Sequence, residues 1–325
     1  MNDILCPSDR RIVVLDGYVA NSGDLSWSEL CALGDLKVYE RTSPARCRGA
    51  YAVFVNKVII DSETIALLPD LRFIGVLATG YNNVDVTAAH RAGITVCNVP
   101  AYSTASVVQT VFSLLLALTN RVESYSSSVA RGEWTACRDF SYRLSPIEEL
   151  DGLTMGVYGL GNIGSRVAAT AHAFGMNVIS LTSKSQDHLP DYIEKVTKDE
   201  LFGRADVLSL NAPLSADNVR FVNADTLARM KSTAILINTS RGGLVDEQAL
   251  AEALRSHRIA AAGLDVLEHE PPLADCPLIG LDNCLITPHV AWQSTASRRR
   301  LLSISADNLA AFLSGAPQNV IESAV

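Results

Sequence analysis

The sequence predicts an α/β protein with two doubly wound parallel-sheet domains, the second inserted into the first and separated from it by a cleft. Its 325 residues are about twice the length of a typical domain. Short apolar runs alternate with helical patterns along the chain, which is typical of parallel sheets covered by helices. The glycine run GLGNIG at residues 159–164 stands near the start of a second such series.

The first series opens at residues 11–16, a β-rich run that ends in an Asp-Gly turn signal. Further strands are predicted at 52–55, 73–77 and 95–97, and helices at 61–68 and 85–92. A long helix is predicted over 104–130, because the capping candidates Ser103 and Thr104 follow Pro100.

The second series begins near residue 154. Its strands are predicted at 155–158, 177–181, 206–210, 234–238, 260–264 and 284–286, and its first helix at 163–174. Six strands with intervening helices are what a doubly wound dinucleotide-binding fold requires. The last helix, at 294–313, follows the completed series and is free to return to the first domain. We therefore expect a substrate-binding domain at 1–102 and 293–325 and a dinucleotide-binding domain at 103–292.

The composition bounds the classes of function. A formal charge of −8 at pH 7 argues against a nucleic-acid surface, and the cluster Arg298-Arg299-Arg300 is interpreted as the solvated face of a helix. Seven cysteines without a CxxC pair indicate free or buried thiols in a reducing compartment. Residues 1–10 are predicted to be an unstructured lead-in, and residues 1–9 lack a signal-peptide pattern. The most apolar segment, 107–118, is too short to span a bilayer. These observations predict a soluble cytoplasmic protein without nucleic-acid or membrane partners.

The glycine run follows a predicted strand and opens a predicted helix, the context that makes a GxGxxG match specific. In this Rossmann-like arrangement Gly159 permits the tight turn, Gly161 lets a pyrophosphate approach the backbone, and Gly164 lets the helix pack close to the sheet. The N–H groups at the helix start, around Asn162 and Ile163, then favour phosphates. The run therefore predicts a bound dinucleotide.

The residues after the second strand of this domain bear on which dinucleotide is bound. An acid there would accept hydrogen bonds from the ribose 2′-OH of NAD and repel a 2′-phosphate. This chain has Thr182, Ser183 and Lys184 instead, and its nearest acid, Asp187, lies further into the loop. Hydroxyls and a lysine suit a 2′-phosphate, so NADP is modestly favoured, although a hydroxyl can also bond the ribose of NAD.

Three charged residues follow predicted strands of the second domain, at the edge where ligands bind in open α/β sheets. They are Arg241, Glu270 and His289. A guanidinium suits a carboxylate, a histidine can donate a proton near neutral pH, and a carboxylate can keep the imidazole protonated and oriented. Together they fit the reduction of a 2-keto acid. No metal site is expected at Glu268-His269-Glu270, because adjacent loop residues seldom point at one ion.

These residues and their flanking sequences resemble the D-isomer-specific 2-hydroxyacid dehydrogenases over essentially the whole chain. The matching stretches are GLGNIG at 159–164, NTSRGGLVD at 238–246, GLDV at 263–266 continuing to Glu270-Pro271, and TPH at 287–289. The resemblance implies that Arg241 binds substrate, His289 donates a proton and Glu270 tunes the histidine. The cofactor contacts that it implies are Thr104, Asn211, Pro213, Thr239, Ser240, Arg241, Asp265 and His289.

The first domain resembles the glycerate dehydrogenase (hydroxypyruvate reductase) branch of this family. The matching stretches are VLDGY at 14–18, GDLSW at 23–27, ATGYNNVD at 78–85 and NVPAYST at 98–104, and DFSY at 139–142, outside that domain, resembles the same branch. By this likeness the N–H groups around Ala78, Thr79 and Gly80 hold the substrate carboxylate opposite Arg241, and hydroxypyruvate is reduced to D-glycerate with NAD(P)H. Where that branch has a tryptophan this chain has Arg143, which either lines the substrate mouth or faces water.

Other interpretations of the sequence stay open. Glyoxylate or another short 2-keto acid is the nearest alternative substrate. Formate oxidation is disfavoured because Glu270 and His289 would be idle, and phosphoglycerate oxidation because no regulatory C-terminal domain follows and no basic cluster is evident in the first domain. In a different class, the fold could serve as a dinucleotide-sensing scaffold for protein partners. The resemblance also implies a homodimer formed through the second domain, with the 104–130 helix and the segment 134–144 as candidate contacts.

Overall fold

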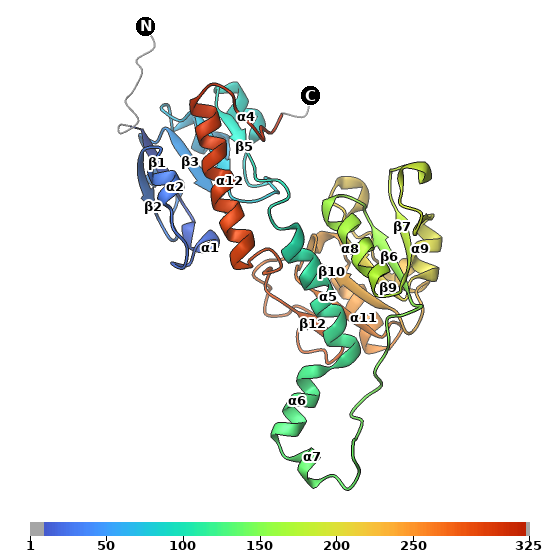
Figure 1. Ribbon diagram of the computed structural model, residues 1–325. Helices are drawn as coiled ribbons and strands as arrows, with labels where there is room; N and C mark the ends of the chain where they lie inside the picture. Colours follow the sequence, from blue (N-terminus) through green and yellow to red (C-terminus); the bar gives the residue numbers. More distant parts are fainter. Residues whose placement is uncertain (1–9, 323–325) are drawn as a thin grey trace. The chain divides into compact units, whose positions relative to one another are not determined.

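The computed structural model describes residues 10–322 and divides into two compact units. Unit 1 comprises Met1–Ser103 with Gln293–Val325, and unit 2 comprises Thr104–Trp292. Each unit is built on its own parallel sheet (Figure 1), so the predicted class of two α/β parallel-sheet domains is confirmed. Residues 1–9, which carry the signal-peptide prediction and all but the last residue of the lead-in predicted at 1–10, lie outside the described residues.

Unit 1 has a five-stranded sheet in the order β2-β1-β3-β4-β5. Its strands are β1 (Arg11–Val14), β2 (Asp35–Val38), β3 (Ala52–Val55), β4 (Phe73–Val76) and β5 (Thr95–Cys97). The central strands β3 and β4 are buried throughout, as expected of parallel strands covered on both faces. The sequence prediction missed β2, because an edge strand that carries Asp35 and Lys37 lacks an apolar run.

The helices of unit 1 are α1 (Gly17–Ala20), α2 (Ser28–Cys31), α3 (Ser62–Ala66), α4 (Val86–Arg91) and α12 (Thr295–Leu313). Arg298 of α12 donates two hydrogen bonds of 2.6 Å to the carboxylate of Asp24, and this pairing lowers the pKa of that carboxyl to about 2. Arg300 donates to the carbonyl oxygen of Tyr102. The interpretation of the three consecutive arginines as a purely solvated face is therefore wrong, since two of them fasten α12 to its unit.

Unit 2 has a seven-stranded parallel sheet in the order β12-β11-β10-β9-β6-β7-β8. Its strands are β6 (Thr154–Tyr158), β7 (Asn177–Leu181), β8 (Ile193–Lys195), β9 (Val207–Leu210), β10 (Ile235–Asn238), β11 (Ala261–Leu264) and β12 (Cys284–Ile286). The strand order reverses between β6 and β9, and ligands of doubly wound sheets bind at such a switch point. The six predicted strands are present, and the short polar edge strand β8 is the additional one.

The helices of unit 2 are α5 (Thr104–Asn120), α6 (Val122–Ala130), α7 (Glu133–Ala136), α8 (Asn162–Ala173), α9 (Lys198–Arg204), α10 (Ala224–Leu227) and α11 (Glu247–Arg255). The single helix predicted over 104–130 is wrong, because Arg121 takes a left-handed conformation with φ of 48° and separates α5 from α6. An arginine gives no sequence signal for that conformation, which glycine and asparagine usually supply. No single helix of the described chain is long and apolar enough to cross a membrane; α5 and α6 reach that length only together, across a bend of 55°.

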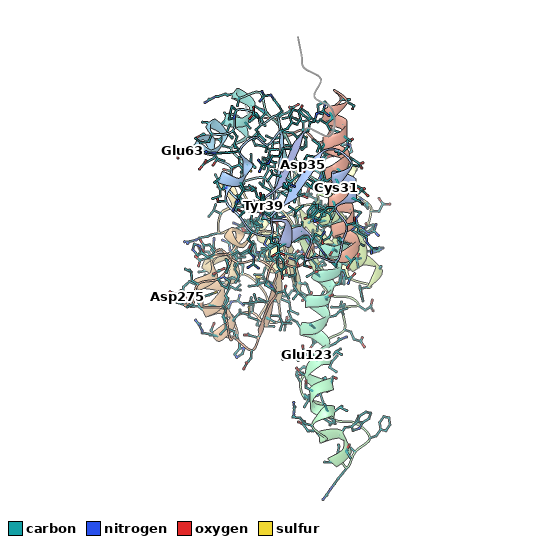
Figure 2. The ribbon with its side chains drawn as sticks, turned by 90° about the vertical axis from the view of Figure 1, so that its left-hand side faces the viewer. Cys31, Asp35, Tyr39, Glu63, Glu123 and Asp275 are labelled. Carbon is teal, nitrogen blue, oxygen red and sulfur yellow. The ribbon has the colours of Figure 1, made fainter. Side chains whose placement is uncertain are left out.

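Residues 122–149, which we call the arm, extend away from the sheet of unit 2. Figures 1 and 2 show α6 and α7 projecting from the unit, with Glu123 near the start of α6. The returning segment of the arm is hydrogen-bonded to its helices at several points, among them Ser128 with Tyr142. The hydroxyl of Tyr125 accepts from the N–H of Leu144 at 3.0 Å, and Trp134 Nε1 donates to the carbonyl oxygen of Phe140 at 3.0 Å. These hydrogen bonds fix the conformation of the arm, although many of its side chains are exposed.

Candidate active site

The turn after β6 has the geometry that its glycines predict. Gly159 has φ of +90°, and a Cβ there would lie 2.9 Å from the backbone of Ala212. A Cβ on Gly164 would lie 1.9 Å from the carbonyl oxygen of Gly159, so only glycine lets α8 start this close to the strand. Around Gly161, in contrast, a Cβ would meet open space. The backbone at Gly161 is thus accessible to a ligand.

A hollow of about 530 Å³ lies against this turn and the start of α8. Gly161 caps α8 without a side-chain hydrogen bond, so the first N–H groups of the helix are available to an anion. The lining residues of the hollow are Thr104, Leu160, Gly161, Asn162, Ser165, Arg166 and Lys184. Two cations and free N–H groups fit the phosphates of a dinucleotide. Sequence reasoning missed Arg166, although its spacing of four residues from Asn162 places it on the same helix face.

The residues after β7 bring Lys184 to this hollow. The hydroxyl of Thr182 accepts from the N–H of Lys184 at 3.3 Å, and Lys195 Nζ donates to the carbonyl oxygen of Lys184 at 2.7 Å. Ser183 and Lys184 are exposed at the end of this turn. None of the described residues that line the hollow is acidic. The turn therefore presents cationic and hydroxyl groups where an NAD-specific site carries a carboxylate.

The turns after β9 and β10 are joined by side chains. Ser240 Oγ donates to the carbonyl oxygen of Ala212 at 2.6 Å. Asn238 accepts from the N–H of Ser240 and donates to the carbonyl oxygen of Arg241 at 2.9 Å. Arg241 is exposed, and its Nη1 donates to the carbonyl oxygen of Ser240 at 2.7 Å. Asn211 Oδ1 is buried without a partner in the described chain. Pro213 and Thr239 lie on the same two turns.

The segment that carries His289 is braced by Asp265, whose side chain is almost completely buried. Its carboxylate accepts hydrogen bonds from the hydroxyl of Thr287 at 2.5 Å and from the N–H groups of Val290 and Ala291 at 2.9 and 2.8 Å. The carbonyl oxygen of Asp265 accepts from the N–H of His289. Sequence reasoning missed this bracing role, because the partners stand on the turn after a different strand. A contact of Asp265 with the nicotinamide end stays a prediction.

His289 and Glu270 form the central pair of the site. His289 Nδ1 lies 2.6 Å from Glu270 Oε2, and Glu270 Oε1 accepts from the N–H of Leu267 at 3.1 Å. The two side chains are 26% and 33% exposed, so the pair is accessible from solvent. A carboxylate at Nδ1 keeps a proton on that nitrogen and leaves Nε2 as the atom that can exchange a proton with a ligand.

Arg241 stands on the neighbouring strand end. It follows β10, Glu270 follows β11 and His289 follows β12, and these three strands are adjacent. A Cβ on Gly242 would lie 1.9 Å from the carbonyl carbon of Leu267, so the turn of Arg241 and the loop of Glu270 are in backbone contact. The structure thus brings the three predicted residues to one edge of the sheet. Within residues 10–322, no group of three or more His, Cys, Asp or Glu side chains is arranged to hold a metal ion.

In unit 1 the predicted anion-binding residues Ala78, Thr79 and Gly80 follow β4. Their N–H groups donate to no acceptor in the described part of the chain. Consecutive free N–H groups outside regular structure are typical of anion-binding backbone. This stretch lies at the carboxyl edge of the sheet of its own unit.

Two parallel-sheet units, a glycine turn at a switch point and an acid–base pair after other strands of the same sheet define a dinucleotide-dependent oxidoreductase of the α/β class. Residues 112–291 match the family described as D-isomer specific 2-hydroxyacid dehydrogenase, NAD binding domain. The chain belongs to the D-isomer-specific 2-hydroxyacid dehydrogenases. It is therefore an enzyme that acts on a CH–OH group of a small 2-hydroxy acid and uses NAD.

Similar proteins cover nearly the whole chain. The chain is 43% identical over 319 residues to the hydroxypyruvate reductase of Blautia hydrogenotrophica, and the alignment covers 96% of this chain and 99% of that protein. It is 39% identical to the glycerate dehydrogenase of Methylorubrum extorquens, with the same shares covered. Among solved structures it is similar to an acyclic imino acid reductase in complex with NADPH and D-Arg. That likeness has a TM-score of 0.84 and 31% identity, and covers 96% of this chain and all of that one.

Proposed function

We propose that this enzyme reduces hydroxypyruvate to D-glycerate and catalyses the reverse oxidation. The observation that carries the proposal is the His289–Glu270 pair, 2.6 Å apart and on the same sheet edge as Arg241. The names of the two relatives, hydroxypyruvate reductase and glycerate dehydrogenase, support this substrate.

In the direction of reduction, His289 donates a proton from Nε2 to the carbonyl oxygen of the keto acid. When bound, the nicotinamide supplies the hydride that the carbonyl carbon takes up. Glu270 holds the imidazole through Nδ1, which fixes the direction of Nε2. Arg241 donates from its guanidinium to the keto acid and stabilises the negative charge that grows on the carbonyl oxygen. Arg241 Nη1 also donates to the carbonyl oxygen of Ser240 at 2.7 Å, so we assign its other N–H groups to the keto acid.

We assign the carboxylate of the substrate to the N–H groups of Ala78, Thr79 and Gly80. The absence of intramolecular acceptors for these groups in the described chain supports the assignment. A carboxylate offers several lone pairs and forms strong charge-assisted bonds with such donors.

We further propose that NADP is preferred over NAD. Lys184 and Arg166 line the hollow beside the glycine turn, and both are cations that suit a 2′-phosphate. The similar imino acid reductase was solved in complex with NADPH, which agrees with this preference. We also keep as proposed cofactor contacts the other residues that the family resemblance implies. They are Thr104, Asn211, Pro213, Thr239, Ser240, Arg241, Asp265 and His289.

We also propose a homodimer whose contact includes the arm. The arm exposes large apolar side chains, and Phe140 is 92% exposed. Exposed apolar groups of this kind mark interaction surfaces. Arg143, for which the sequence leaves a substrate mouth and water as alternatives, is exposed on the same arm. The cytoplasmic location stays a prediction.

The purified chain tests the proposal when hydroxypyruvate, glyoxylate and pyruvate are each assayed with NADH and with NADPH. We expect the highest kcat/KM with hydroxypyruvate and NADPH. The variant His289→Ala should lose at least about a hundredfold in kcat, as general acids contribute, and retain cofactor binding measured by NADPH fluorescence. Full activity in His289→Ala would refute the role of the histidine, and absence of turnover with every keto acid would favour the dinucleotide-sensing scaffold.

A further inference from the structure

Three consecutive peptide groups after β4 are each fixed by a donor from another part of unit 1. Asn56 Nδ2 donates to the carbonyl oxygen of Leu77 at 2.5 Å. The N–H of Val99 donates to the carbonyl oxygen of Ala78 at 3.0 Å. Asn98 Nδ2 donates to the carbonyl oxygen of Thr79 at 2.7 Å. The three carbonyl groups of this stretch therefore have defined directions.

A trans peptide is planar, with its C=O and the following N–H pointing in opposite directions. A donor that fixes the carbonyl of Leu77 therefore also fixes the N–H of Ala78. In the same way the bond to Ala78 fixes the N–H of Thr79, and the bond to Thr79 fixes the N–H of Gly80. Each of the three N–H groups assigned to the substrate carboxylate thus belongs to a peptide plane whose carbonyl oxygen is hydrogen-bonded, and its direction is fixed by that bond.

Asn98 is itself anchored from the carboxyl-terminal part of the chain. Its carbonyl oxygen accepts from Asn308 Nδ2 at 2.9 Å, and its N–H donates to the carbonyl oxygen of Asn319 at 3.2 Å. Asn319 Nδ2 in turn donates to Asn308 Oδ1 at 2.8 Å. Three asparagines therefore form a continuous hydrogen-bonded series that ends on the peptide between Thr79 and Gly80.

The position of Asn308 is unfavourable for an asparagine. It lies within α12 and is 1% exposed. Asparagine is a poor helix former, and burying its amide is unfavourable unless both ends are bonded. Its amide donates to Asn98 and accepts from Asn319, so neither end is unpaired. Stability alone would be served at least as well by a leucine of similar volume.

We propose that Asn98, held by Asn308 and Asn319, is a positioning residue that sets the direction of the carboxylate-binding N–H group of Gly80 through the carbonyl of Thr79. The proposal rests on the proposed function, in which this backbone binds the keto-acid carboxylate. Without the Asn98 amide, the peptide between Thr79 and Gly80 is free to rotate, and its carbonyl oxygen can then face the carboxylate and repel it. Asn98 therefore acts on substrate affinity through Thr79 and touches no reacting atom.

The test uses the full-length enzyme with Asn98→Ala and Asn308→Leu. Asn98→Ala removes the donor to Thr79, whereas Asn308→Leu keeps the volume in α12 and removes the donor to Asn98. The readouts are the KM for hydroxypyruvate, the affinity for the non-reacting carboxylate oxamate in the presence of NADPH, the affinity for NADPH alone, and the midpoint of thermal unfolding. Asn283→Ala is the matched control, because Asn283 also donates from its amide to backbone carbonyls but lies in unit 2 before β12.

In Asn98→Ala we expect KM and the oxamate dissociation constant to rise about tenfold, the factor for one charge-assisted hydrogen bond, with NADPH affinity within about twofold. In Asn308→Leu we expect about a threefold rise in the same two quantities and an unfolding midpoint that is unchanged or higher. Asn283→Ala should lower the midpoint and leave both keto-acid quantities unchanged.

Unchanged oxamate affinity in a folded Asn98→Ala overturns the inference, as does a loss of oxamate and NADPH affinity by the same factor. If Asn98→Ala does not fold, Asn308→Leu decides the matter: an unchanged KM overturns the inference and a raised KM at unchanged stability supports it. Wild-type enzyme without keto-acid turnover or oxamate binding would instead refute the proposed function.

Discussion

At the scale of single residues, the two carboxylate oxygens of Glu270 hold the imidazole of His289 in a defined orientation. Oε2 receives His289 Nδ1 and Oε1 receives the N–H of Leu267. A glutamine has one acceptor oxygen and one NH2 donor, so it can serve only one of these two donors. Replacing Glu270 by glutamine therefore changes the side-chain volume little but removes one of its two hydrogen bonds.

We predict that Glu270→Gln lowers kcat by about ten- to a hundredfold, part of the effect of a misplaced general acid. NADPH affinity should stay within about twofold, because the glycine turn is untouched. Glu268→Gln is the control, since the exposed side chain of that neighbour forms a long ion pair with Arg220 at 3.8 Å and does not contact His289 in the described chain. Steady-state kinetics on both variants check the prediction, and equal effects of the two would contradict it.

Lys184 bears on the choice of cofactor. It lines the hollow beside Gly161 and Arg166. We predict that Lys184→Ala raises the KM for NADPH about tenfold, the value of one charge-assisted contact with a phosphate, and changes the KM for NADH less than twofold. Lys37→Ala, an exposed lysine of unit 1, is the control. A parallel rise for both cofactors would place Lys184 on the pyrophosphate instead of the 2′-phosphate.

At the scale of elements, the sequence predicts what the hydrophobic pattern encodes and misses what depends on position in the sheet. All central strands carry apolar runs and are predicted, as are the edge strands β5 and β12, whereas the other two edge strands, β2 and β8, are polar and are missed. The break at Arg121 is missed because a left-handed arginine is stabilised by its surroundings and has no local signature.

The candidate site likewise has a part that the sequence predicts and a part that it does not. Arg241, Glu270 and His289 are identifiable in sequence because each stands directly after a strand or its short loop. The bracing of residues 287–291 by Asp265 and the series from Asn319 to Asn98 join segments far apart in the chain, and no single-sequence pattern reports such contacts.

The arm is the element for which a solution measurement is most direct. Phe140 is almost fully exposed, and its backbone is fixed by Trp134. We predict that Phe140→Asp shifts the enzyme from dimer to monomer by at least about tenfold in dissociation constant, since it places a charge in an apolar contact. Analytical ultracentrifugation measures this. Ile59→Asp, an exposed apolar residue of unit 1, should leave the sedimentation unchanged. A monomeric wild-type enzyme would contradict the dimer itself.

At the scale of the whole molecule, three buried thiols report on the two units separately. Cys47 and Cys97 lie in unit 1 and Cys284 lies in unit 2. Burial raises the pKa of each thiol to about 12. The pKa of each thiol is higher in the folded chain than the value near 9 in the unfolded chain. The free energy of unfolding is therefore unaffected by these thiols below pH 9, and it falls as the pH rises from 9 towards 12, because the unfolded thiols ionise first. At pH 8 the folded thiols are therefore protonated and unreactive, whereas roughly a tenth of each unfolded thiol is thiolate.

Each unit has its own buried core, and the glycine turn with its hollow lies in unit 2. We predict that NADPH at a hundredfold excess over its dissociation constant stabilises unit 2 by about 2.7 kcal/mol, and so raises the urea midpoint for maleimide labelling of Cys284 by roughly 1 M. The midpoints for Cys47 and Cys97 should move by less than a quarter of that shift. Pulsed labelling along a urea series at pH 8, read by mass spectrometry, measures all three thiols in one experiment. The exposed thiol of Cys31 serves as the internal standard, because it reacts at every urea concentration. Equal shifts at all three buried thiols would show instead that the two units unfold as one cooperative body, and that cofactor binding stabilises the substrate-binding unit as strongly as its own.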